Sequence, residues 1–229
     1  MTSDLASWTP RERPAHAALE GRFVRLVSLD AAVHGDALYE ITANDPERFR
    51  YLFEAPPADR AALQPWLDKA ATSSDPLWYT VIDKKSGKIA GRQSFMRIDQ
   101  AHGVIEIGNI LWSSLMARSP ASTEALFLFA KHAFDDLGYR RFEWKCNNLN
   151  EPSKQAALRY GFSFEGVFRQ HMVVKGQNRD TAWFSMLDGE WPLLRTAFER
   201  WLDPANFGSD GKQLKRLADI REALAGGDA

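Results

Sequence analysis

The sequence predicts an α/β fold of the α+β kind, with a mixed, mostly antiparallel central sheet and helices on both of its faces. Two observations lead to this prediction. Three strand-like segments are separated by short turns at 84–88 and 100–103, which is typical of an antiparallel meander. A further pair of strands is joined by the turn-rich sequence KGQNRD at 175–180, and helical periodicity fills the stretches between the strands.

The N-terminal segments precede the meander. Residues 1–20 are polar and aperiodic, so we expect an arm that lies over the surface. Residues 21–28 alternate apolar and polar side chains, which predicts a first strand. Asp30 can cap a helix that runs to about Thr42, and a second helix is expected at 59–71.

The meander and a central helix follow. The three strands are expected at 77–83, 89–99 and 104–113. A proline, which is favoured in the first helical turn, begins the central helix at 120–137, and Gly138 stops it.

The last third of the chain alternates strands with helices. We expect strands at 141–146, 164–174 and 180–187, a short helix at 152–159, and two C-terminal helices at 191–202 and 211–224. The predicted organisation is an arm at 1–20, a main domain at 21–190 and a helical extension at 191–229. The apolar faces of the last two helices could pack inward or against a second copy, so a monomer and a homodimer both remain open.

The composition excludes several classes of protein. Of 229 residues, 45% are hydrophobic, which allows a full core, and the formal net charge of −1 argues against a nucleic-acid partner. One cysteine rules out an internal disulfide. Neither a signal-peptide pattern nor an apolar run of about 18 residues occurs, so we expect no membrane partner and a cytoplasmic location. The five histidines show no ligand spacing, so we expect no metal site.

The most specific stretch of the sequence lies at 142–166. A strand runs into a polar loop, and a short helix begins at a proline and ends before a glycine. This block contains, in order, Asn147, Asn150, Ser153, Gly161, Phe162, Glu165 and Gly166. It resembles the last conserved block of the GCN5-related N-acetyltransferases, and it is most similar to the branch that includes the ribosomal-protein alanine acetyltransferases (RimJ/RimL-like).

The resemblance implies both a fold and an activity. In that family the last meander strand and the strand after the central helix run parallel and splay apart, and the pantetheine arm of acetyl-CoA pairs with the exposed strand edge. The chain is thus expected to move an acetyl group from acetyl-CoA, as cosubstrate, to a primary amine of a peptide or protein N-terminus or of a small molecule, by direct attack. The alternative is a non-catalytic acyl-CoA-binding sensor or interaction module on the same scaffold.

The segment that binds phosphate in this family has a different sequence here, which favours the non-catalytic alternative. The family pattern is Gln/Arg-x-x-Gly-x-Gly/Ala at the start of the central helix, where free N–H groups and the helix dipole hold the pyrophosphate. In this chain Pro120 stands in place of the central glycine, although the following Thr-Glu-Ala matches the branch. By this resemblance, the cofactor-binding residues at this helix are Arg118, Ser119, Ala121, Ser122 and Thr123. Ser119 can cap the helix, and the hydroxyls of Ser122 and Thr123 could add donors.

In the family that the chain resembles, a carboxylate of the fourth strand often activates the amine, and by this resemblance Glu106 is the expected catalytic base. It is flanked by two isoleucines in its strand, so its side chain faces the opposite side from theirs, which could be solvent or the substrate cleft. We favour the cleft, where it would accept the proton of the amine directly or through water. A backbone N–H near Leu111 or Trp112, after a β-bulge, is expected to stabilise the oxyanion.

Ser153 is the second expected catalytic residue. It matches the serine of the family's Asn-x-x-Ser and could deliver a proton to the thiolate of CoA; a first-turn serine that satisfies backbone N–H groups is the alternative. Asn147 and Asn150 are expected to bind the cofactor, although Asn150 could only cap the helix. Ala157 stands where other members carry a catalytic tyrosine, so that mechanism is unavailable at this place.

Several other polar and aromatic residues are weaker candidates. Cys146 is expected to be a small buried packing residue, and His171 a secondary candidate for proton transfer. Side chains that could line the cleft or its acceptor side are Trp78, Trp112, Arg92, Gln93 and Arg97. By the resemblance, the acceptor pocket is shaped by 29–75 and by the hairpin at 170–180, where no motif identifies the acceptor.

Overall fold

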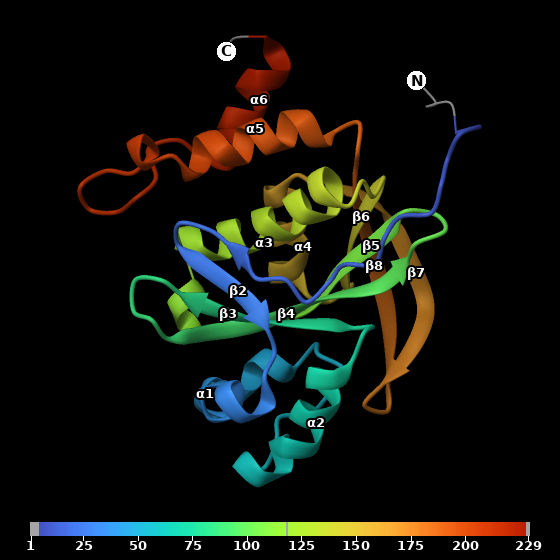
Figure 1. The fold of residues 1–229 in the computed structure, drawn as a ribbon, viewed down its shortest axis with the longest axis vertical. Coiled ribbons are helices and arrows are strands. Elements are labelled where there is room, and N and C mark those ends of the chain that lie inside the picture. Colours follow the sequence, from blue (N-terminus) through green and yellow to red (C-terminus); the bar gives the residue numbers. More distant parts are fainter. Residues whose placement is uncertain (1–4, 118, 228–229) are drawn as a thin grey trace.

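One eight-stranded sheet forms the centre of the molecule in the computed structural model, which describes residues 5–117 and 119–227 (Figure 1). The strand order is β1-β2-β3-β4-β5-β6-β8-β7, and among the described strands only β5 and β6 pair in parallel. The strands are β1 Leu19–Glu20, β2 Val24–Ser28, β3 Leu77–Asp83, β4 Ile89–Asp99, β5 Val104–Trp112, β6 Arg141–Asn147, β7 Ser163–Val174 and β8 Gln177–Leu187. The predicted fold class, with its single parallel pair, is confirmed.

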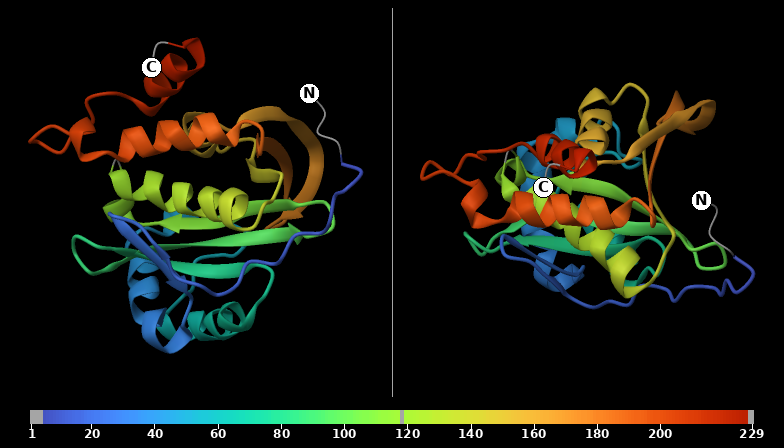
Figure 2. Two further views of the ribbon diagram at one scale, coloured as in Figure 1. Left: turned by 45° about the horizontal axis from the view of Figure 1, so that its top comes forward. Right: turned by 90° about the horizontal axis from the view of Figure 1, so that it is seen from above.

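Helices cover both faces of the sheet (Figures 1 and 2). The helices are α1 Ala31–Asn44, α2 Arg60–Thr72, α3 Pro120–Lys131, α4 Glu151–Tyr160, α5 Trp191–Leu202 and α6 Leu217–Gly226. The first two lie together on one face, while α3 and α4 lie on the other. The last two helices form a further layer outside α3 (Figure 2).

The main core lies between the sheet and the helices α3 to α6. It includes apolar side chains of the C-terminal helices, among them Leu194, Phe198, Trp201, Leu217 and Ile220. These side chains therefore pack inward against the rest of the chain. A second, smaller apolar cluster joins α1 and α2 to the other face of the sheet.

Local signals in the sequence fix most of the element boundaries. The side chain of Asp30 accepts hydrogen bonds from the N–H groups of Ala32 and Val33, so it caps α1 as expected. Gly161 ends α4 with a φ of 96°, a left-handed conformation that costs a glycine little. The strands at 77–83 and 89–99 have the predicted bounds.

The β7–β8 hairpin is tighter than predicted. The expected loop at 175–180 is only a two-residue turn, because Lys175 and Gly176 both have positive φ and Val174 pairs with Gln177. Lys-Gly here adopts the pair of left-handed conformations that a type I′ turn requires. Strand β8 consequently begins three residues before the predicted Asp180, and this brings Arg179 into the sheet.

Three other boundaries differ from the predictions. The first predicted strand, at 21–28, begins only at Val24, because residues 21–23 form the turn between β1 and β2 and N–H groups at this turn donate to a carboxylate from α3. The α-helical part of the predicted helix at 120–137 ends at Lys131 and continues as a π-helical turn over His132–Asp136. The last helix starts at Leu217 rather than 211, because the chain before it bends at Gly211, which has a φ of 75°.

The described part of the N-terminal arm, from residue 5, lies along the surface of the sheet layer. The indole N–H of Trp8 donates to the carbonyl of Ala101 at 2.8 Å. Further along, the hydroxyls of Tyr139 and Tyr79 donate to the carbonyls of Glu12 and Ala15. The arm then enters β1, so its position is set by hydrogen bonds along much of its length.

Glu124 connects α3 to the start of the sheet. Its buried carboxylate accepts hydrogen bonds from the backbone N–H groups of Arg22, Phe23 and Val24 at 2.6–2.8 Å. A Cβ on Gly21 would lie 2.3 Å from this carboxylate, so the turn closes tightly around it. This contact gives the glutamate of the Thr-Glu-Ala sequence a structural role: it fixes the N-terminal turn of α3 against β2.

We expect Glu124→Ala to lower the free energy of unfolding by about 3–4 kcal/mol, because three backbone donors lose a charged acceptor in a buried place. Urea denaturation followed by circular dichroism measures this loss. The matched control is Glu199→Ala on α5, an exposed residue paired with Arg195, for which we expect less than about 0.5 kcal/mol. Equal effects of the two substitutions would contradict the assigned role of Glu124.

Candidate active site

The parallel strands β5 and β6 separate half-way along their length. They pair from Val104 with Arg141 to Ile107 with Trp144 and no further. Beyond this point β5 continues along β4 as far as Trp112, while β6 continues along β8. A cavity of about 480 Å³ opens between the diverging ends, and its walls include the two strand segments 107–112 and 144–147.

A bulge in β5 accompanies the separation. Between the pairs of Ser94 with Gly108 and Arg92 with Leu111, β5 contains one residue more than β4. Asn109 lies in this bulge with a φ of 54°, and its amide donates to the hydroxyl of Ser94 at 3.0 Å. The bulge that the sequence predicted before Leu111 is thus present.

A loop between α1 and α2 covers the cavity on one side. Residues 45, 47, 48 and 51–53 contribute to the lining. The loop is fixed at two points: the ammonium group of Lys175 donates to the carbonyl of Phe49 at 2.6 Å, and the hydroxyl of Tyr51 donates to the carbonyl of Leu149 at 3.1 Å. These contacts tie the loop to the β7–β8 hairpin and to the loop before α4. The two segments that were expected to shape the acceptor pocket therefore both reach this cavity.

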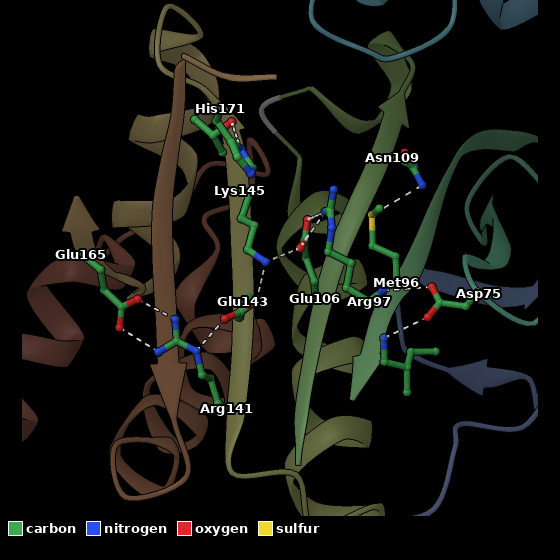
Figure 3. Close-up of polar contacts among 12 residues, drawn as sticks. Asp75, Met96, Arg97, Glu106, Asn109, Arg141, Glu143, Lys145, Glu165 and His171 are labelled. Atoms are coloured by element: carbon green, nitrogen blue, oxygen red, sulfur yellow. Dashed lines mark hydrogen bonds and ion pairs between the residues drawn. The ribbon is translucent and has the colours of Figure 1, made fainter. Parts of the chain in front are cut away.

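Glu106 lines the cavity and is 2% exposed. Its carboxylate accepts hydrogen bonds from Arg97 at 2.8 and 2.9 Å and forms an ion pair with Lys145 at 2.9 Å (Figure 3). Of the two environments that the sequence allowed, the structure has the cleft rather than open solvent. Burial raises the pKa of Glu106, and Lys145 and Arg97 act in the opposite direction.

The ion pair at Glu106 is one end of a row of charges across the sheet (Figure 3). Lys145 also contacts Glu143 at 2.6 Å, and Glu143 contacts Arg141 at 2.6 Å. Arg141 pairs in turn with Glu165 on β7 at 2.5 Å. Hydrogen bonds from Arg141 lower the pKa of Glu165 to about 2. The buried ammonium group of Lys145 is thus shared between two carboxylates.

The backbone of Arg97 has an unusual conformation that Asp75 stabilises. Arg97 has a φ of 48°, unusual for a residue with a side chain, and lies at an irregularity in the pairing of β4 with β5. The carboxylate of Asp75 accepts from the N–H groups of Arg97 and Ile98 at 2.9 and 3.0 Å (Figure 3). This contact stabilises the conformation from which the guanidinium group reaches Glu106.

Ser153 and the asparagines of the predicted block lie on the other side of the opening. Ser153, Asn147 and Asn150 all line the cavity. The hydroxyl of Ser153 accepts a hydrogen bond from the indole N–H of Trp144 at 3.0 Å, and its own hydrogen can donate to another acceptor, of which the sulfur of Cys146 is one. Asn150 accepts from the N–H of Ser153 and caps α4, which was one of its two predicted roles.

Cys146 is buried, as expected, and also lines the cavity. Burial raises the pKa of its thiol, while a hydrogen bond with Ser153 acts in the opposite direction. The thiol is therefore a weak nucleophile at neutral pH.

The N-terminus of α3 lies outside the cavity lining. Arg118 falls outside the described residues. Ser119 occupies the N-cap position, but its hydroxyl donates to the carbonyl of Met116 at 3.1 Å and does not cap the helix. The hydroxyl of Ser122 donates to Ser119, and Ala121 is buried. The first N–H groups of α3 have therefore no capping side chain.

Thr123, one of the predicted donors at this helix, is fully buried, and its hydroxyl accepts a hydrogen bond from Arg159 of α4 at 3.0 Å. It therefore contributes to the packing between α3 and α4.

Several of the weaker candidates also have structural roles. Trp78 does not line the cavity; it packs with Trp66 around the guanidinium group of Arg92, which pairs with Glu54. Gln93 is buried and accepts from the indole of Trp112. The remaining ones are placed as follows: Arg97, Leu111 and Trp112 line the cavity, Ala157 and Tyr160 are buried in the core, and His171 contacts Thr181 at 2.9 Å outside the cavity lining.

Three cationic residues of the cavity lining, Arg48, Lys145 and Arg179, were not named from the sequence. Lys145 alternates with apolar neighbours in β6, a pattern that normally means a solvent-facing side chain. Arg179 lies in the segment that the sequence assigned to a loop. The only signal in the sequence for Arg179 was the length of the β7–β8 turn. A two-residue Lys-Gly turn would have predicted a strand that begins early enough to include Arg179.

Two kinds of feature are missing from the part of the chain that the structure describes. No helix there has the length and apolar character needed to cross a bilayer. Within residues 5–117 and 119–227, no group of three or more His, Cys, Asp or Glu side chains is arranged to hold a metal ion.

A splayed parallel pair with a cavity between its ends defines the class of the acyl-CoA N-acyltransferase fold. The family model described as acetyltransferase (GNAT) domain matches residues 24–163. A solved structure of a GCN5-related N-acetyltransferase from Brucella melitensis is 59% identical, covers 94% of this chain and 99% of that one, and superposes with a TM-score of 0.93. This chain therefore belongs to the GCN5-related N-acetyltransferase (GNAT) family.

Two curated proteins are more distant relatives. An uncharacterized N-acetyltransferase, p20, of Bacillus licheniformis is 31% identical over 113 residues, which is 49% of this chain. YdaF of Bacillus subtilis, named as a proposed ribosomal N-acetyltransferase, is 29% identical over 105 residues, which is 46% of this chain. The matches span 63% and 57% of the lengths of these relatives. They agree with the branch that the sequence resembles.

We expect Lys145→Met to lower the free energy of unfolding by about 3 kcal/mol near neutral pH, because it leaves two buried carboxylates with one counter-charge fewer. The loss of Lys145 should raise the pKa of Glu106 further. A carboxyl whose pKa is higher in the folded than in the unfolded state destabilises the fold increasingly as pH rises. The penalty should therefore be larger at about pH 8 than at about pH 5, as measured by urea denaturation at both values.

The double variant Lys145→Met/Glu143→Gln is the matched comparison, because it removes a carboxylate together with the ammonium group. We expect it to recover part of the lost stability. A penalty that is independent of pH and unchanged in the double variant would mean that Lys145 acts through packing alone.

Proposed function

We propose that this protein is an N-acetyltransferase that moves the acetyl group of acetyl-CoA to a primary amine by direct attack. The observation that carries the proposal is the cavity between the diverging ends of β5 and β6, with Glu106 and Ser153 both in its lining. The membership of the chain in the GNAT family supports the same reaction.

The donor is expected to bind along the separated strands. Beyond Ile107 the edge of β5 that faces away from β4 has no strand partner, so its N–H and C=O groups need another one. The pantetheine arm carries amide groups that can satisfy them. The uncapped N-terminus of α3 suits the pyrophosphate, because free N–H groups and the helix dipole both favour an anion there.

The backbone N–H of Trp112 is the best candidate to stabilise the oxyanion. The N–H of Ser113 donates to the carbonyl of Ala90 on β4 at 2.8 Å. Successive N–H groups of an extended strand point to opposite sides, so that of Trp112 points away from β4 and toward the opening. Of the two residues that the sequence suggested, the alternation thus favours Trp112 over Leu111.

The charges around Glu106 favour a neutral amine. Arg97, Lys145 and Arg179 all lie in the cavity lining, and a cationic surrounding lowers the pKa of an ammonium group bound among them. Glu106 can accept the released proton directly or through water, since the carboxylate has room for more than the hydrogen bonds it already accepts. Burial raises the pKa of Glu106, which favours acceptance of a proton, whereas Lys145 and Arg97 oppose this shift and favour the carboxylate form.

Ser153 is positioned to protonate the leaving thiolate. Its oxygen accepts from Trp144, so its one hydrogen can donate either to the sulfur of Cys146 or toward the cavity. Such a donor acts mainly in the transition state, because the sulfur gains negative charge only as the bond to the acetyl carbon breaks. No acetyl-enzyme is required, so Cys146 should be dispensable.

We expect Ser122→Asp to weaken acetyl-CoA binding at least about tenfold, because a carboxylate in the first turn of α3 repels the pyrophosphate and competes for the same N–H groups. Isothermal titration calorimetry measures the affinity. Ser122→Ala is the control and should bind nearly as the unsubstituted protein does. Unchanged affinity of the Asp variant would remove the phosphate from this helix.

Glu106→Gln should lower kcat by about 100-fold with little effect on acetyl-CoA affinity, since general bases contribute at least this much. Ser153→Ala should lower kcat less, because water can replace the hydroxyl, and Cys146→Ala should remain active. The assay screens amine acceptors by release of free CoA. Binding of acetyl-CoA with no release for any amine would favour the non-catalytic module, while a labelled acetyl group trapped on Cys146 would refute direct attack.

A further inference from the structure

Arg179 is a buried cation with no counter-ion of its own. It is 7% exposed, lines the cavity, and makes a ring contact with Phe53 at 4.7 Å. Its Nε is buried and donates to nothing among the described residues, and no carboxylate there forms an ion pair with it. Buried guanidinium groups are normally paired, because leaving the charge unpaired away from water has a large free-energy cost. The position of Arg179 therefore calls for an explanation.

The other cations of the cavity already have partners. Arg97 and Lys145 contact Glu106, and Arg48 forms an ion pair with Asp45 at 2.7 Å, although its Nε, like that of Arg179, donates no hydrogen bond. Neither of these carboxylates forms a hydrogen bond or an ion pair with Arg179, although the charge of Glu106 acts on it from a distance. Arg179 lines the cavity without an ion-pair partner, and a guanidinium group is suited to a carboxylate because it can donate two parallel hydrogen bonds to it.

Arg179 lies on the side of the sheet where an acceptor would enter. In the pairing of β6 with β8, Lys145 is opposite Trp183 and Asn147 is opposite Thr181, so the side chains at 179, 181 and 183 share a face with Lys145. Trp144, on the other face, contacts Ser153. Arg179 is therefore grouped with Glu106 and the covering loop, and is separated from the serine proposed to act on the donor.

We propose that Arg179 binds a carboxylate of the acceptor, so that the preferred acceptor is a small amine that carries a free carboxylate, such as an amino acid. This inference rests on the proposed N-acetyltransferase function and specifies its substrate class. The carboxylate supplies the missing counter-charge, while the amine of the same molecule lies among cations that favour its neutral form. A protein N-terminus presents a neutral amide at the corresponding position and leaves Arg179 unpaired.

The experiment compares L-amino acids with their carboxamides as acceptors, with CoA release as the readout. The unsubstituted protein should use the acids about 10- to 100-fold better in kcat/KM, the range for one charge-assisted contact. Arg179→Gln should lose this preference by lowering kcat/KM for the acids, with little change for the amides. Arg179→Lys, which keeps the charge without the fork, should fall between the two. Arg169→Gln on β7, an exposed arginine outside the cavity lining, is the control and should keep the preference.

A second measurement does not depend on turnover. N-acetylated amino acids should bind the complex of the protein with CoA more tightly than N-acetylated amino acid amides, and Arg179→Gln should abolish the difference in calorimetry. Equal use or equal binding of acids and amides, or an Arg179→Gln variant that loses both alike, overturns the assignment. If neutral amines or peptides are acetylated without preference, the proposed function stands and the substrate class is wrong. If acetyl-CoA binds and no amine of any kind releases CoA, the proposed function itself fails.

Discussion

The arrangement of the site depends on the ion pair between Glu106 and Lys145. Glu106 on β5 lies one residue before the last paired position of the two strands, Ile107 with Trp144, and Lys145 on β6 lies one residue after it. The ion pair holds the strands together at this point, and the bulge at Asn109 turns β5 away immediately beyond it. The cavity begins where this pairing ends, so the position of the ion pair along the strands fixes where an acetyl group and an amine can meet.

Much of the fold could be predicted from local signals. Turn residues set the meander, Asp30 and Asn150 cap their helices, and Gly161 ends α4 through its positive φ. The parallel pair and its separation came from the resemblance to a family and not from periodicity, because no local pattern specifies which distant strands become neighbours. The resemblance likewise predicted which segments line the acceptor side, but it did not predict which of their side chains would face the acceptor.

The rest of the site depends on contacts between distant parts of the chain. Lys145 and Glu143 alternate with apolar residues as solvent-facing charges do, yet both are buried, because they belong to a row of charges on neighbouring strands. Thr123 looks like a surface donor in a helix N-terminus until Arg159 of α4 covers it. Trp78 looks like a cleft residue until the packing of α2 encloses it. In each case the sequence gives the chemical group and the tertiary structure decides what surrounds it.

The row of charges explains how a reactive carboxylate can be buried without a large loss of stability. Desolvation of Glu106 alone would favour its neutral form, which is a poor base. Lys145 and Arg97 offset this, but Lys145 is itself buried and needs Glu143, which in turn needs Arg141. The row ends at Glu165, where water can solvate the charges. A buried base in this sheet thus requires alternating charges that continue to the surface. Arg179 does not belong to such a row, and among the cations of the described cavity lining it is the one whose positive charge a bound molecule can neutralise.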